Sequence, residues 1–180
     1  MTKTTAKRFS SSDIEIAIER IAEDIANNHR DTAELFFAGI AQGGIPVARR
    51  LADKVSEQIG RKISVGVVDV SFHRDDIGAK PIPKITSPTE IPKNIDGGTC
   101  ILVDDVIFSG RSTRAALNEL FDQGRPDRIE LAILVDRGGR KLPIQPDYVG
   151  FLEETSHDED VTVQMDSDDP DADTILITRK

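Results

Sequence analysis

Four short apolar runs that alternate with amphipathic segments constrain the fold of this chain more than any other feature. The runs cover residues 35–40, 63–70, 99–103 and 129–135. The segment after the first run and the segment before the last run repeat their apolar side chains at helical spacing, and both end near a glycine. Regular strand–helix–strand alternation predicts an α/β fold with a central parallel sheet that is flanked by helices.

Segments outside this alternation complete the predicted architecture of a single domain over residues 1–180. Ser12 and Glu15 form a capping-box pattern, which predicts the start of an N-terminal amphipathic helix. Residues 73–98 contain four prolines and no sustained period, so we expect a flexible arm there. Residues 147–180 predict an acidic all-β appendage.

Composition and charge exclude several classes of protein. One cysteine rules out an intrachain disulfide, and no apolar run approaches the roughly 20 residues that span a bilayer. The formal net charge is −9, and residues 151–180 hold ten acidic and two basic side chains. A dedicated nucleic-acid binder carries a basic surface instead. We therefore expect a cytoplasmic protein without a membrane segment.

The most informative segment is Ile101-Leu-Val-Asp-Asp-Val-Ile-Phe-Ser-Gly-Arg-Ser-Thr113, in which an apolar strand is followed by two acids and a helix start. The N–H groups and the dipole at a helix N-terminus favour a bound phosphate, and a glycine lets the backbone approach it closely. Carboxylates beside such a site suit the hydroxyls of a ribose. The segment therefore predicts a ribose 5-phosphate site built from Asp104, Asp105, Ser109, Gly110, Arg111, Ser112 and Thr113.

This segment resembles the phosphoribosyl-diphosphate (PRPP) signature of type I phosphoribosyltransferases. Leu134-Val-Asp-Arg-Gly-Gly-Arg-Lys-Leu-Pro-Ile144 and residues 69–76, 110–117, 124–126 and 147–150 look like the PyrR family. Its members are pyrimidine operon attenuation regulators that also have uracil phosphoribosyltransferase activity. The resemblance runs from about Ser12 to Met165 and implies a type I fold with a flexible loop and a small hood.

The resemblance implies that uracil and PRPP give UMP and diphosphate, with Mg²⁺ held mainly through the substrate rather than by protein ligands. Asp104 and Asp105 would hold the ribose hydroxyls, and Arg74 in the arm would stabilise the leaving diphosphate. The segment that would face the uracil is Val135, Asp136 and Arg137. Family members associate, so we expect a homo-oligomer.

Three departures from the family pattern bear on function. The diphosphate loop, usually Thr-Arg-Gly, reads Gln42-Gly43-Gly44 and so offers one fixed cation fewer; it looks more like the Lys-Gly-Gly loop of hypoxanthine–guanine phosphoribosyltransferases. Gly139 and Lys141 stand where histidine and glutamate are common. Residues 13–24 have one basic side chain and residues 153–160 have none, which predicts no tight RNA binding. A UMP- or PRPP-sensing RNA-binding regulator, a transferase for another base and an inactive nucleotide sensor stay open as alternatives.

Overall fold

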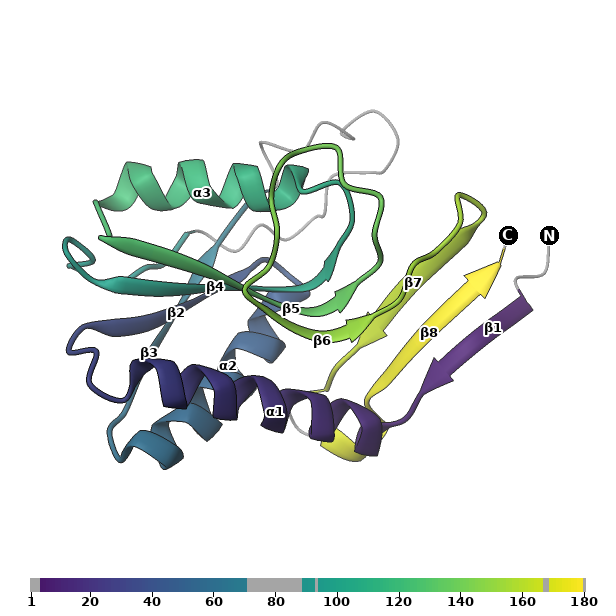
Figure 1. Cartoon of the computed structure of the whole chain (residues 1–180), viewed down its shortest axis with the longest axis horizontal. Helices are drawn as coiled ribbons and strands as arrows, with labels where there is room; N and C mark the ends of the chain where they lie inside the picture. Colours follow the sequence, from purple (N-terminus) through teal and green to yellow (C-terminus); the bar gives the residue numbers. More distant parts are fainter. Residues whose placement is uncertain (1–3, 71–88, 93, 167–168, 180) are drawn as a thin grey trace.

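The computed structural model describes residues 4–70, 89–92, 94–166 and 169–179. Five parallel strands form the central sheet in the order β3-β2-β4-β5-β6 (Figure 1). They are β2 (Leu35–Ile40), β3 (Ser64–Val68), β4 (Thr99–Ile107), β5 (Arg128–Asp136) and β6 (Tyr148–Leu152). The predicted α/β fold with a parallel sheet is confirmed.

Helices cover both faces of this sheet because its strands are apolar on both sides. The two helices α1 (Ser11–His29) and α2 (Gly44–Ile59) pack on one face, and α3 (Arg111–Gln123) packs on the other (Figure 1). Alternation along β4 serves both layers: Ile101 packs in the cluster with α1 and α2, and Leu102 packs in the cluster with α3. No helix within the described ranges has the length and apolarity that a membrane crossing requires.

A small antiparallel sheet lies beside β6 and has the order β1-β8-β7. Its strands are β1 (Thr4–Phe9), β7 (Glu159–Gln164) and β8 (Thr174–Arg179), with a 3-10 turn, η1 (Pro170–Ala172), before β8. The ring of Phe9 contacts that of Phe151, with 4.4 Å between centroids. Lys7 Nζ lies 2.6 Å from Glu153 Oε1. These contacts attach the small sheet to the end of β6.

Two local predictions were wrong. The cap of α1 is Ser10, not Ser12: its hydroxyl accepts from the Asp13 N–H at 3.3 Å, and Asp13 accepts from the Ser10 N–H at 2.8 Å. Ser12 already lies in the first helical turn, so Ser12 and Glu15 cannot form the predicted capping box. The predicted appendage was also placed too early, because β6 joins the central sheet through its pairing with β5.

The predicted arm over residues 73–98 lies mostly outside the described residues, and so does Arg74. Its described end is attached to β3. Val67 and Glu90 exchange two backbone hydrogen bonds of 2.8 and 2.9 Å. Ile95 is buried in the core cluster on the α3 side of the sheet. The segment that returns from the arm to β4 is therefore part of the packed domain.

Candidate active site

A cavity of about 680 Å³ opens at the carboxyl ends of β4 and β5, where parallel α/β sheets bind their ligands. The cavity is lined by β4 with the turn that follows it, and by the N-terminus of α3. Strand β7 of the small sheet contributes Val161. We call residues 108–113 the phosphate turn. The cavity is lined by Asp104, Asp105, Val106, Ile107, Phe108, Ser109, Gly110, Arg111, Ser112, Thr113, Arg137, Lys141 and Val161.

Asp104 and Asp105 lie within β4, which extends four residues further than its apolar run predicts. Asp104 is 8% exposed, and its Oδ1 accepts from the Asp105 N–H at 3.0 Å. Asp105 Oδ1 accepts from the Val106 N–H at 2.8 Å. Burial raises the pKa of the Asp105 carboxyl above its usual value, against the opposing effect of hydrogen bonds with Asp104 and Val106. Local backbone contacts thus fix both carboxyl groups at the cavity.

The phosphate turn has the backbone that a bound anion requires. Gly110 has φ of 86°, a conformation that glycine adopts at low cost, and α3 begins at the next residue. The hydroxyl of Ser109 accepts from the Arg111 N–H at 3.4 Å. Gly110, the N-cap residue of α3, has no side chain that could cap the helix. The first residues of α3, Arg111, Ser112 and Thr113, line the cavity, and the N-terminus of a helix favours an anion.

The Gln42-Gly43-Gly44 loop reaches Asp105 from β2. A second cavity of about 520 Å³ is lined by Gln42, Gly43 and Asp105, so Asp105 borders both cavities. A Cβ on Gly43 would lie 2.2 Å from Asp105 Oδ2, and a Cβ on Gly44 would lie 2.3 Å from the Val103 carbonyl oxygen. The peptide bond between Ala41 and Gln42 is cis. At Gly44 only glycine permits this close approach to the β4 backbone, whereas a Cβ at Gly43 would displace the Asp105 carboxyl group.

The base loop, residues 136–144, begins at the last residue of β5 and forms the third side of the site. Of the three predicted nucleobase residues, Arg137 lines the first cavity, whereas Val135 is fully buried in the core. The Asp136 carboxylate forms an ion pair with Arg140 and accepts from the Gly138 N–H at 2.9 Å. Arg137 donates to the Thr155 hydroxyl at 2.8 Å and to the Glu159 carbonyl at 2.6 Å. Of the three predicted nucleobase residues, Arg137 therefore lines the cavity, and Val135 and Asp136 are not among its lining residues.

Comparison with known proteins decides the family. The chain matches the family model described as "Phosphoribosyl transferase domain" over residues 9–169. It is 46% identical over 177 residues to the "Bifunctional protein PyrR" of Corynebacterium glutamicum, with 96% of this chain and 91% of that protein covered. The chain belongs to the PyrR family of phosphoribosyltransferases. The protein of the same name from Streptomyces coelicolor is 46% identical over 169 residues, covering 93% and 86%.

Solved structures confirm the type I phosphoribosyltransferase fold for this PyrR family member. The hypoxanthine phosphoribosyltransferase of Trypanosoma cruzi superposes with a TM-score of 0.69 at 17% identity, over 96% of this chain and 95% of that one. A complex of the enzyme from the same organism with the product IMP gives a TM-score of 0.70 at 17% identity, covering 99% and 94%. The chain as a whole therefore has the same fold as these enzymes.

Two kinds of cavity residue escaped the sequence-based prediction. Phe108 lies between the two acids and the Ser109-Gly110 pair and was given no role from the sequence, although it lines the first cavity. Val161, Val163 and Met165 line the cavities from β7 and the residue after it. No local signal marks these β7 residues, since their place at the site comes from the docking of the small sheet.

Proposed function

We propose that this PyrR family member transfers the phosphoribosyl group of PRPP to uracil. The bond between ribose C1 and the diphosphate oxygen breaks, a bond from C1 to uracil N1 forms, and the N1 proton leaves. The products are UMP and diphosphate. The observation that carries the proposal is that Asp104, Asp105 and the phosphate turn line one and the same cavity.

The geometry of the cavity suits the two ends of the phosphoribosyl group. The N–H groups of the phosphate turn would bind the 5-phosphate, and the adjacent carboxylates would bind the ribose hydroxyls. Positive charge builds on the sugar as diphosphate leaves, and a negative potential from Asp104 and Asp105 would lower the energy of that state. The rate gain would come from position and electrostatics, since the protein itself forms no bond to the substrate.

The diphosphate and its metal would lie on the side of Asp105 that faces the second cavity. The Gln42-Gly43-Gly44 loop would offer backbone N–H groups to the diphosphate. Among the described residues, no group of three or more histidine, cysteine, aspartate or glutamate side chains could hold a metal ion. We propose that Mg²⁺ arrives with PRPP and is coordinated mainly by phosphate and ribose oxygens. Bound there, Mg²⁺ would neutralise charge on the departing diphosphate.

The nucleobase would lie between the sugar and the base loop, where Arg137 lines the cavity. We propose that Arg137 is the predicted nucleobase residue that lies nearest to the bound uracil. Asp136 would act indirectly, through its contacts with Arg140 and the Gly138 N–H. Arg74, which lies outside the described residues, remains our proposed group for the leaving diphosphate.

A PRPP-dependent screen of five bases tests the proposal. The full-length chain is incubated with PRPP, Mg²⁺ and either uracil, hypoxanthine, guanine, adenine or orotate, and nucleotide formation is measured. We expect UMP as the main product and no product without PRPP. Preferential formation of a purine nucleotide would show that the substrate is a purine base and not uracil. The purines are tested because the Gln42-Gly43-Gly44 loop resembles the loop of hypoxanthine–guanine phosphoribosyltransferases. No nucleotide with any base would leave the chain as a sensor that binds without catalysis.

A further inference from the structure

Backbone hydrogen bonds join the base loop to the end of β4 and to the turn that follows it. The Arg137 N–H donates to the Ile107 carbonyl at 3.1 Å. Two residues after Ile107, in the turn that follows β4, the Ser109 carbonyl accepts from the N–H groups of Lys141 at 3.0 Å and Leu142 at 3.2 Å. The segment that would hold the nucleobase is therefore attached through its own backbone to the segment that would hold the 5-phosphate.

The carbonyl between these two, that of Phe108, is bound by a side chain. Arg140 Nη1 donates to it at 2.9 Å and to the Gly138 carbonyl at 3.3 Å, and Arg140 Nε donates to the Ile144 carbonyl at 3.1 Å. Its Nη2 forms the ion pair with Asp136. One guanidinium thus joins both ends of the base loop to the phosphate turn.

Burial gives these contacts weight. The side chain of Arg140 is 13% exposed and that of Asp136 is 11% exposed. Removal of one side chain of such a buried pair leaves the donors or acceptors of the other unpaired. The resulting loss of stability exceeds the free energy that the pair itself contributes. A planar guanidinium with donors on three nitrogens can reach all four acceptors, whereas a lysine ammonium cannot match that geometry.

The ring of Phe108 makes the same connection by packing. A Cβ on Gly139 would lie 2.1 Å from a ring carbon of Phe108, so the ring rests directly against the glycine backbone. On the same ring, the Arg137 guanidinium carbon lies 4.7 Å from the centroid. Phe108 is therefore a residue of the phosphate turn whose ring packs against the base loop.

We propose that Arg140 is a positioning residue that couples the phosphate turn to the base loop, so that each half of the nucleotide strengthens binding of the other. The inference rests on the proposed function and adds the residue that links its two half-sites. Ligand bound at the turn holds Phe108 and its carbonyl in place, and Arg140 passes that restraint to Asp136 and the loop. Such coupling acts equally in both directions.

Two ligands separate the half-sites in a calorimetric test. UMP spans both halves, whereas ribose 5-phosphate occupies only the phosphate and ribose half. We expect Arg140→Gln to weaken UMP binding about tenfold, within the usual range of coupling between sites, and to leave ribose 5-phosphate binding within about twofold. In steady-state assays the same variant should raise the KM for uracil more than the KM for PRPP. Arg140→Lys, which keeps the charge, should fall between Arg140→Gln and the parent protein.

The matched control is Arg61→Gln. The guanidinium N–H groups of Arg61 also donate to two backbone carbonyls, those of Thr32 and Ala33. These carbonyls lie just before the start of β2, at the end of the strands opposite the cavity. We expect this variant to bind both ligands as the parent protein does. Equal weakening of both ligands by the Arg140 variants, or unchanged UMP binding, would overturn the coupling. A parent protein that binds neither ligand would contradict the proposed function instead. If Arg140→Gln does not fold, the same comparison is decided by Arg140→Lys.

Discussion

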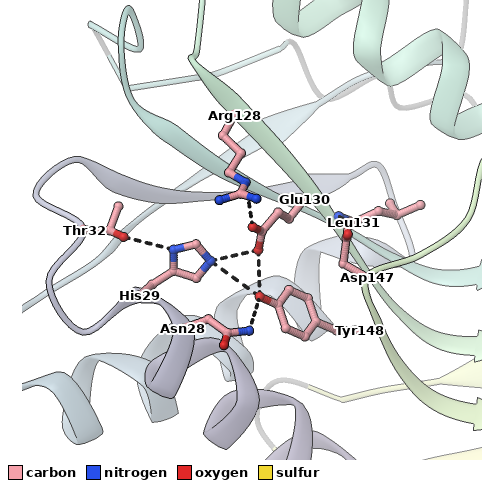
Figure 2. Close-up of polar contacts among 8 residues, drawn as sticks. All are labelled: Asn28, His29, Thr32, Arg128, Glu130, Leu131, Asp147 and Tyr148. Atoms are coloured by element: carbon pink, nitrogen blue, oxygen red, sulfur yellow. Dashed lines mark hydrogen bonds and ion pairs between the residues drawn. The ribbon is translucent and has the colours of Figure 1, made fainter.

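His29 Nε2 lies 2.8 Å from Oε2 of Glu130, although the two residues are 101 positions apart in the chain (Figure 2). The same carboxylate oxygen accepts from the Tyr148 hydroxyl at 2.7 Å, and Arg128 pairs with the other oxygen at 3.0 Å. Asn28 donates to the Tyr148 hydroxyl at 3.1 Å. This cluster joins the end of α1 to the starts of β5 and β6, at the edge of the sheet opposite the cavity.

Acid should weaken this cluster through Glu130. Burial alone would raise the pKa of Glu130, but hydrogen bonds from Tyr148 and His29 outweigh it and hold the pKa below its usual value. A carboxyl with a lowered folded-state pKa stabilises the protein above its unfolded pKa, and this contribution is lost as the pH falls through the folded value. We expect Glu130→Gln to show a smaller loss of the free energy of unfolding between about pH 5 and pH 3.

Urea unfolding at several pH values measures this effect. The control is Glu23→Gln on the exposed face of α1, which should keep the pH dependence of the parent protein. Identical acid profiles for the parent protein and Glu130→Gln would show that the cluster does not contribute through this carboxyl.

Tyr148 offers a direct spectroscopic measurement of the cluster. It is the only tyrosine, and the chain has no tryptophan, so the ultraviolet absorbance of tyrosinate reports this residue alone. Burial, with the hydrogen bond to Glu130, raises the pKa of Tyr148 to about 12, although the bond from Asn28 opposes this. The folded state should therefore lose stability as the pH rises from about 10, the unfolded value, towards the folded pKa. A midpoint near 10 in the folded protein would contradict the burial of this hydroxyl.

The contrast between the two edges of the sheet shows what the sequence could reveal. The phosphate turn and the acids before it are contiguous, so one segment, Ile101 to Thr113, carries strand, acids, turn and helix start together. The four apolar runs predicted the parallel sheet because local period and composition define buried strands. The cluster around His29 and the place of β6 arise only when distant segments pack, and no local pattern marks them.

The glycines of the diphosphate loop permit a matched pair of variants. In Gly43→Ala the new Cβ meets the end of the Asp105 side chain, which can rotate away. We expect this variant to keep its melting temperature within a few degrees and to lose turnover, because Asp105 is displaced. In Gly44→Ala the new Cβ meets the Val103 backbone, which cannot move without disturbing β4. That variant should instead be destabilised by about 1–3 kcal/mol. Full activity in Gly43→Ala would remove Asp105 from the proposed mechanism.

Removal of either carboxylate charge tests the ribose site. Asp104→Asn or Asp105→Asn should lower turnover on the order of 10²-fold, the usual effect of losing one preorganised electrostatic contact. Each amide keeps the size of the side chain, so we expect the thermal unfolding midpoint to change little. Initial rates with saturating PRPP and base provide the measurement. Rates near those of the parent protein for both single variants would remove the proposed ribose site.

The last prediction concerns RNA, because the relatives carry the word bifunctional in their name. RNA binding requires basic side chains that can reach phosphates, and such contacts make affinity fall steeply with salt. Arg20 is the only basic residue within 13–24, and it donates to the carbonyls of Val149 at 3.2 Å and Gly150 at 2.5 Å. Lys7 pairs with Glu153. Both of these cations are thus engaged within the protein.

We therefore expect no tight, UMP-stimulated binding to a pyrimidine-operon leader hairpin at physiological salt. The acids of residues 153–160 would repel the phosphate backbone of RNA. Filter binding with and without UMP, at salt concentrations from about 50 to 200 mM, provides the measurement. A binder that neutralises six or more phosphates should lose roughly 10³-fold or more in affinity over this range. Nanomolar binding that UMP strengthens and salt weakens in this way would make the chain an RNA-binding regulator despite its acidic surface.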